Sequence, residues 1–207
     1  SKVLSYALAS DAVGHEVIAE RIGVNSTGQP FDSVMAIELN GGHTMNPMVN
    51  AGAIATTALL PGGDADERWE ILLDAFSRFA GRRLELDEEV YRSETEHNQR
   101  NMAIARLLES YGRIEVDPLE VVDVYTRQCA LRVTARDLAV MGATLADGGV
   151  NPVTGGARRL GAGLPGHAGG AGGDRHVRAV GRVAVRDRRP RQVGRLGRDR
   201  RDRPGQG

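Results

Sequence analysis

The 207-residue sequence is formally neutral, but its charge is divided between two unlike parts. Residues 1–150 carry 13 basic and 23 acidic side chains, whereas residues 151–207 carry 14 and 4. The single cysteine excludes an intramolecular disulfide, so nothing implies an oxidising compartment, and we expect a cytoplasmic protein. No apolar run is long enough to cross a bilayer, so no membrane partner is expected. No charged-then-apolar leader opens the sequence, which carries little weight because the first residue is not Met.

The first third of the chain predicts helices separated by a long loop. Residues 2–9 have apolar positions at helical spacing. Residues 21–31 are rich in turn-forming residues and predict an irregular loop, and the short apolar stretch 34–39 fits either helix or strand. An Ala-rich helix is expected over residues 46–60, because the fixed φ of Pro47 suits a first helical turn.

Four amphipathic helices are predicted further along the chain. The first, over residues 64–80, has acidic residues in its first turn, where the helix dipole favours them. The second precedes Gly112 and the third follows Pro118. The fourth begins at Thr134, which forms a capping-box-like start with Asp137. The apolar positions expected on the core-facing sides are Trp69, Leu72, Leu73 and Phe76, then Ile104, Leu107, Leu108 and Tyr111, then Val122, Tyr125 and Cys129, the last as a small core residue.

The composition changes abruptly near residue 155. Residues 156–207 contain only Gly, Ala, Arg, Leu, Pro, His, Asp, Val and Gln, which cannot build an ordinary core. This low-complexity tail is open to three interpretations: an Arg-rich nucleic-acid arm, a disordered segment, or GC-rich DNA translated out of frame. We favour the last. Residues 1–155 are expected to form the mostly helical, folded part.

Several separated motifs resemble the serine-dependent glutaminase family. The opening SKVLSYALA resembles the end of the family's QSISKVF segment, whose S-x-x-K pair is shared with penicillin-binding proteins and β-lactamases. Lys2 matches its lysine, and the resemblance implies that the nucleophilic serine would lie three residues before Lys2, so that Ser1 is not that serine. The run MNPMVNAGAI is similar to NPFINAGAI, the most specific match, and VNSTGQPFDSV resembles EPSG..FNS.

Further motifs extend the resemblance to about residue 155. The run SETEHNQRNMAIARLL is similar to a family segment that contacts glutamine, VVDVYTRQCAL resembles a "Y…CAL" helix, and VTARDLAVMGATLADGGVNP a "DLA…LANGG" helix. The family's later TCGMYD and KSGVGGGI motifs are not found. A neighbouring-frame reading of a TCGMYD-like codon string would yield DRHVRAVGRV, with Val177 near the tyrosine.

The resemblance implies both a fold and a function. The fold would be an α+β serine β-lactamase-like domain, and family members assemble as homo-oligomers. The function would be hydrolysis of L-glutamine to L-glutamate and ammonia through an acyl-enzyme, with Lys2 as the base and later a proton donor. As written, the sequence would be an inactive fragment, because the nucleophile is missing.

The resemblance assigns substrate contacts to Asn50, Glu94, Asn101 and Tyr125. Glu94 would bind the α-ammonium group, and the asparagines the polar amide and carboxylate groups. If Glu94 and Asn101 share one helix, their spacing of seven residues places them on one face. Taken singly, Glu94 fits a solvated acid, Asn50 a helix cap and Tyr125 a core residue. Lys2 alone fits a solvated cation at a helix end.

No cofactor and no nucleic-acid partner are expected. The histidines at 15, 43 and 97 lack metal-ligand spacing with cysteines or carboxylates, so no metal is expected, and no Gly-rich phosphate loop is present. Two alternatives stay open. The first is a β-lactamase or transpeptidase relative, which would share S-x-x-K but use other second and third motifs. The second is a non-catalytic helical protein with a basic nucleic-acid-binding tail, which the absence of aromatic residues from the tail disfavours.

Overall fold

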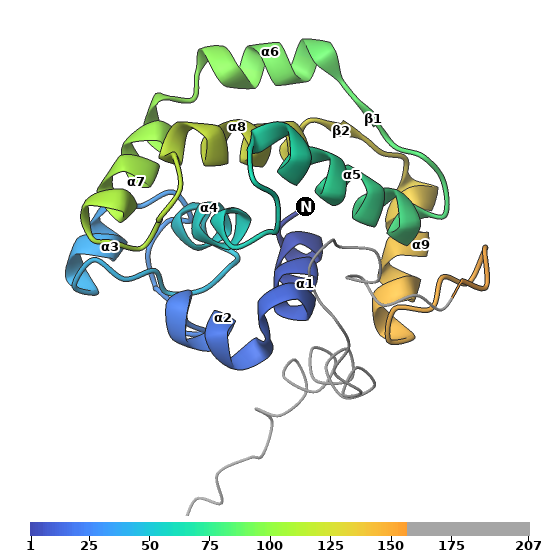
Figure 1. The fold of residues 1–207 in the computed structure, drawn as a ribbon, viewed down its shortest axis with the longest axis horizontal. Helices are drawn as coiled ribbons and strands as arrows, with labels where there is room; N and C mark the ends of the chain where they lie inside the picture. Colours follow the sequence, from blue (N-terminus) through green and yellow to red (C-terminus); the bar gives the residue numbers. More distant parts are fainter. Residues whose placement is uncertain (157–207) are drawn as a thin grey trace, which may run out of the picture.

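The computed structural model describes residues 1–156 as a helical body (Figure 1). The predicted tail therefore lies, except for Gly156, outside the described residues. The helices and strands are α1 Lys2–Val13, α2 His15–Arg21, α3 Met35–Leu39, α4 Asn50–Ala58, α5 Ala65–Ala80, β1 Glu85–Leu86, α6 Glu88–Glu96, α7 Gln99–Ser110, α8 Pro118–Cys129, β2 Leu131–Arg132 and α9 Ala135–Ala146.

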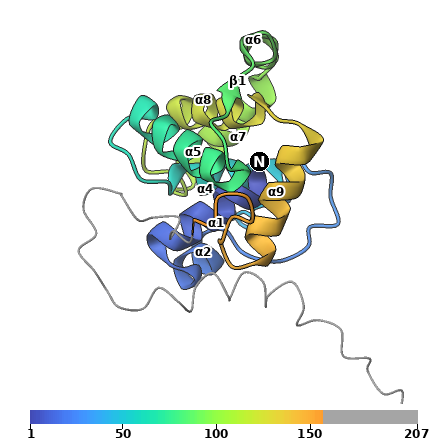
Figure 2. The same ribbon diagram turned by 90° about the vertical axis from the view of Figure 1, so that its right-hand side faces the viewer.

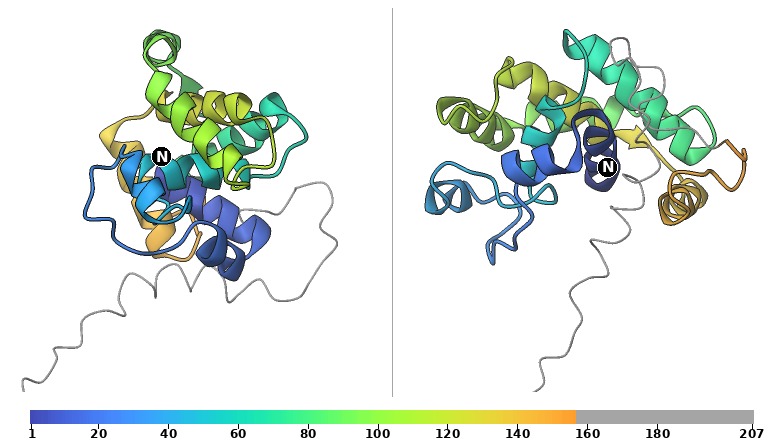
Figure 3. Two further views of the ribbon diagram at one scale, coloured as in Figure 1. Left: turned by 90° about the vertical axis from the view of Figure 1, so that its left-hand side faces the viewer. Right: turned by 60° about the horizontal axis from the view of Figure 1, so that its bottom comes forward.

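Helices α4 and α8 occupy the middle of the body. Helix α8 contacts α4, α5, α6 and α7, and α1 contacts α2, α4 and α5. Helix α6 lies on the outside over α8 (Figure 2) and has no buried residue. Helix α9 packs beside α5, at the opposite end of the body from α3 (Figure 3). Helix α1 thus packs against helices from two later parts of the chain, α4 and α5. The only strands in the described part are the two-residue antiparallel pair β1 and β2.

The predicted amphipathic helices are confirmed. In α5 the expected apolar stripe of Trp69, Leu72, Leu73 and Phe76 is buried. The Asp64 carboxylate accepts a hydrogen bond from Glu67 N at the start of this helix, and Gly81 ends it with a left-handed φ of 73°. Within residues 1–156, we find no helix with the length and apolar character that a membrane span requires.

Three local expectations about helix bounds and burial were wrong. Tyr111, expected on the core-facing side of the helix before Gly112, is exposed, because α7 already ends at Ser110. The helix expected over residues 46–60 begins only at Asn50, because the Asn46 side chain accepts hydrogen bonds from Met48 N and Val49 N and holds the preceding backbone in a turn. Cys129 is exposed rather than buried. The last turn of α8 lies beside the start of α1, where the Cys129 sulfur is 3.6 Å from Ser1 Oγ.

The capping box of α9 is also an ion-pair site. Thr134 Oγ1 accepts from Asp137 N, and the Asp137 carboxylate accepts from Thr134 N. Arg82 donates to both carboxylate oxygens, Nε at 2.8 Å and Nη2 at 2.6 Å. These hydrogen bonds, first from Arg82 and then from Thr134, lower the pKa of Asp137 well below its ordinary value.

We expect Asp137→Asn to lower the urea midpoint at pH 7 and to remove part of the acid sensitivity of the fold. A carboxylate with a depressed folded-state pKa stabilises the protein above the ordinary aspartate value of about 3.9 and loses that effect as pH falls through the folded value. Urea unfolding at pH 7, 5 and 3 should show the gap between variant and parent closing with acid. Asp147→Asn, at the exposed far end of α9, is the control. A gap that stays constant from pH 7 to 3 would contradict the assignment.

Candidate functional site

Four of the five side chains predicted from the sequence meet in one network around Asn50. Lys2 Nζ donates to Asn50 Oδ1 at 2.8 Å and to Met48 O at 3.0 Å. Tyr125 OH donates to Asn50 Oδ1 at 3.3 Å, and Asn50 Nδ2 donates to Asn101 Oδ1 at 3.0 Å. These residues come from α1, α4, α7 and α8, so the network depends on the packing of all four helices.

The placement of Asn50 follows from the turn before α4. Asn50 N donates to Phe31 O at 2.7 Å, which ties the first residue of α4 to the loop after α2. The side chain is buried, and all three polar neighbours described above satisfy its carboxamide. Asn50 therefore forms the centre of the site rather than capping its own helix, for which no side-chain capping bond is present.

Glu94 lies at the edge of this network. It is exposed on α6, and its carboxylate has no hydrogen bond or ion pair among the described residues. Its negative charge nevertheless contributes to the raised pKa of Tyr125. The expectation that Glu94 and Asn101 share a helix is wrong, since α6 ends at Glu96 and α7 begins at Gln99. The break is stabilised by Asn98, whose buried side chain makes hydrogen bonds of its own.

Burial favours the neutral forms of both titratable groups at the centre of the site. Desolvation lowers the pKa of Lys2, and neither of its hydrogen-bond acceptors carries a charge. Its Nζ lies 5.4 Å from the centroid of the Phe31 ring. Burial, followed by Cys129 and Glu94, raises the pKa of Tyr125, so its hydroxyl stays protonated and remains a hydrogen-bond donor. A lysine in this environment loses its proton more readily than one in water.

Sequence reasoning missed two residues, Asn98 and Thr126, that extend the hydrogen-bond network away from Lys2. Asn101 Nδ2 donates to Asn98 Oδ1 at 2.7 Å, and Asn98 Nδ2 donates to Thr126 Oγ1 at 2.6 Å. Asn98 stands three residues before Asn101, and Thr126 follows Tyr125, which is the only signal that the sequence offered. The Met48 carbonyl, a backbone acceptor, carries no residue-type signal at all.

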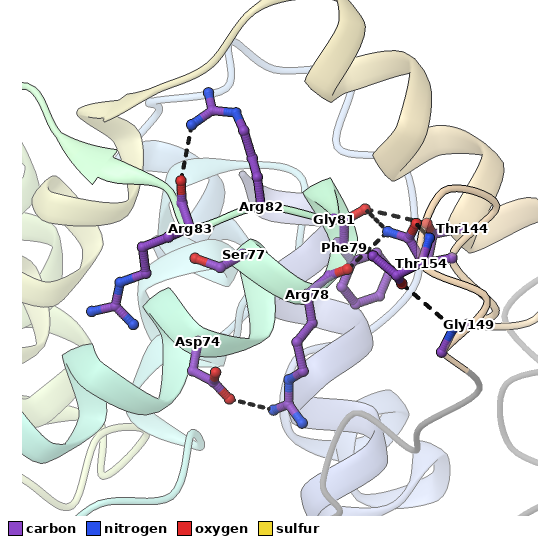
Figure 4. A pocket seen from close by; sticks show the side chains of 12 residues that line it. Asp74, Ser77, Arg78, Phe79, Gly81, Arg82, Arg83, Thr144, Gly149 and Thr154 are labelled. Atoms are coloured by element: carbon purple, nitrogen blue, oxygen red, sulfur yellow. Dashed lines mark hydrogen bonds and ion pairs between the residues drawn. The ribbon is translucent and has the colours of Figure 1, made fainter.

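A separate cavity lies away from this network (Figure 4). It has a volume of about 400 Å³ and lies at the end of α5 beside α9 and the loop that follows it. Its arginines are paired with carboxylates, Arg78 with Asp74 at 2.8 Å and Arg82 with Asp137. None of the five predicted site residues lines it. Among residues 1–156, no group of three or more His, Cys, Asp or Glu side chains could hold a metal ion.

Comparisons with known proteins agree on one family. A family model described as Glutaminase matches residues 1–159. Glutaminase 2 of Yersinia pestis is 57% identical over 154 residues, which is 74% of this chain and 45% of that protein. The glutaminase of Brucella canis is 54% identical over 155 residues, 75% of this chain and 49% of that protein. The solved structure of a probable glutaminase, ybaS, superposes with a TM-score of 0.75 at 44% identity and covers 79% of this chain and 53% of that one. The chain thus spans about half the length of the curated relatives it matches.

Proposed function

Because the chain belongs to the glutaminase family, we propose that it carries the lysine and the substrate-contacting side chains of an amidohydrolase that converts L-glutamine to L-glutamate and ammonia. The observation that carries the proposal is the convergence of Lys2, Asn50, Asn101 and Tyr125, from four helices, on one hydrogen-bonded centre. Glu94 lies at its edge, where a carboxylate can meet the α-ammonium group of the substrate.

In the proposed reaction a serine hydroxyl attacks the side-chain carboxamide of glutamine. In the S-x-x-K arrangement that serine belongs three positions before Lys2, one helical turn away, where the two side chains lie side by side. Neutral Lys2 takes the hydroxyl proton, the serine oxygen bonds to the carbonyl carbon, and the C–N bond breaks as Lys2 returns the proton to the departing ammonia. Water then hydrolyses the acyl-enzyme to glutamate. The lowered pKa of Lys2 supports its role as the base.

We extend the proposal to the whole domain. Residues 1–155 would form the helical part of an α+β serine β-lactamase-like domain, because they superpose on about half of a solved glutaminase. The interpretation of residues 156–207 as a Gly/Arg/Ala-rich low-complexity tail, translated out of frame, stays a prediction, and so does homo-oligomeric assembly.

Ammonia release in a chimera tests the proposed function. Residues 1–155 replace the matching segment of the 57% identical Yersinia pestis relative, and the chimera, that relative and the 207-residue chain are assayed on L-glutamine and D-glutamine. We expect the chimera to release ammonia from L-glutamine only, because the carboxylate and amide contacts select one configuration at the α-carbon. A folded chimera that is inert on L-glutamine, beside an active parent, would refute the proposal. Hydrolysis of a β-lactam instead would favour the β-lactamase alternative.

A further inference from the structure

A chain of hydrogen bonds leads from the centre of the site into the protein core, with the same direction throughout. Asn50 Nδ2 donates to Asn101 Oδ1, Asn101 Nδ2 donates to Asn98 Oδ1, and Asn98 Nδ2 donates to Thr126 Oγ1. The Thr126 hydroxyl donates in turn to Val122 O at 2.8 Å. Both Asn98 and Thr126 are buried, with exposed fractions of 8% and 4%. Water therefore offers little replacement for either contact.

The two ends of this chain demand the same orientation of every carboxamide. At one end the Lys2 ammonium is a donor only, so it requires the oxygen of Asn50. At the other end the Thr126 hydroxyl uses its hydrogen on a backbone carbonyl, so it can only accept, and it requires the nitrogen of Asn98. If the amides were reversed, Asn50 Nδ2 would face the ammonium, and Asn98 Oδ1 would face Thr126 Oγ1 without a hydrogen between them.

We propose that Thr126 and Asn98 are positioning residues that act through Asn101 to hold the carboxamide oxygen of Asn50 toward Lys2. Neither residue contacts Lys2 itself. The catalytic part of this inference rests on the proposed function, because there the two positioning residues would hold Asn50 and Asn101 in one fixed orientation toward the substrate. Its electrostatic consequence does not, because an oxygen held toward Nζ stabilises the ammonium form of Lys2 whatever the reaction.

Other groups around Lys2 also act on its proton. Cys129, at the end of α8, acts on it directly, and the α-amino group of Ser1, immediately before α1, interacts with it. Tyr125 shares the acceptor Asn50 Oδ1 with Lys2, and Glu94 acts on Tyr125 from α6. Substitution of Thr126 changes none of these groups. A change in Lys2 titration after that substitution therefore reports on the amide chain.

Lys2 is the only lysine in the sequence, so lysine labelled with ¹³C and ¹⁵N gives a single side-chain signal in the intact 207-residue chain. Titration of that signal by NMR measures the Lys2 pKa without any need for turnover. Thr126→Val removes the acceptor at nearly constant volume, and Thr126→Ser keeps the hydroxyl as the matched control. Asn98→Ala interrupts the series of hydrogen bonds one step nearer to Lys2. It serves as the second variant if the Thr126→Val protein does not fold.

We expect Thr126→Val and Asn98→Ala to lower the Lys2 pKa by roughly half a unit to one unit, the effect of losing one buried hydrogen bond that favours the charged form. Thr126→Ser should titrate like the parent. An unchanged Lys2 pKa in folded Thr126→Val or Asn98→Ala, an equal shift in the serine variant, or an ordinary lysine pKa in the parent would each overturn the inference. If the Lys2 pKa falls in Thr126→Val but the chimera is inert on glutamine, only the proposed function is refuted. If the chimera is active but the Lys2 pKa is unchanged in Thr126→Val, only the positioning role is refuted.

Discussion

Gly52→Ala is expected to destabilise the protein by about 3 kcal/mol or more, whereas Gly142→Ala in another helix is expected to stabilise it by about 0.5–1 kcal/mol. Both glycines lie within helices, Gly52 in α4 and Gly142 in α9. A Cβ added at Gly52 would lie 1.8 Å from the backbone oxygen of Asn46. A Cβ at Gly142 would have no described atom within 4 Å.

The difference arises because the obstacle at Gly52 is backbone. The same Cβ would lie 2.6 Å from Asn46 C and 3.2 Å from Pro47 Cα, so no side-chain rotation can make room and the turn before α4 must move. That turn carries the Met48 carbonyl, which accepts from Lys2, and ends at Asn50. Gly52→Ala should therefore disturb the site as well as the fold.

Urea unfolding followed by circular dichroism measures both variants against the parent. Gly142→Ala measures how much alanine stabilises a helix where a Cβ meets no other atom. The difference between the two variants therefore measures the cost of the steric clash between the Cβ at position 52 and the turn at Asn46. Equal changes in the two variants would mean that the turn does not pack against Gly52 as described. The single lysine signal offers a second readout, because it should change in Gly52→Ala and stay unchanged in Gly142→Ala.

Helices with a clear apolar period were predictable from the sequence, and the path of the chain between them was not. The stripe of α5 and the capping box of α9 depend on neighbours within four residues, so local patterns reveal them. The start of α4 depends on hydrogen bonds from Asn46 and on the contact with Gly52, and here the helix-opening preference of Pro47 misled the prediction. Cys129 followed the apolar period of α8, yet the period ends where the helix reaches the edge of the site.

The convergence of Lys2, Asn101 and Tyr125 on Asn50 could be anticipated only through resemblance, and the geometry of their contacts could not be predicted at all. No local pattern links Lys2 to Asn50, since the contact joins residues 48 positions apart. The separation of Glu94 from Asn101 by a helix break followed from the buried contacts of Asn98, which depend on the packing of α7 against α8. Polar networks of this kind are fixed by tertiary packing, so a sequence pattern does not reveal which donor meets which acceptor.

Lys2→Ala in the active chimera is expected to lower the rate of glutamine hydrolysis by a factor of roughly 10²–10⁴, the usual contribution of a positioned general base. Lys2→Arg should lose activity as well, because a guanidinium keeps the charge but does not release its proton near neutral pH. With Lys2 present, kcat/KM should fall as pH decreases through the Lys2 pKa, which burial brings below its ordinary value, because only the neutral amine accepts a proton.

The control for the lysine variants is Arg106→Ala, which removes a basic side chain from the exposed face of α7, where Arg106 pairs with Glu109 at 3.0 Å. Its activity should equal that of the parent chimera, since exposed pairs of this kind contribute little to stability. The arginine variant at position 2 decides between two roles for Lys2. If Lys2→Arg keeps most of the activity, a fixed positive charge is sufficient and Lys2 is not the base. If both lysine variants are inactive while circular dichroism shows an intact fold, the reaction requires an amine that can give up its proton, which is the property that burial beside two uncharged acceptors confers on Lys2.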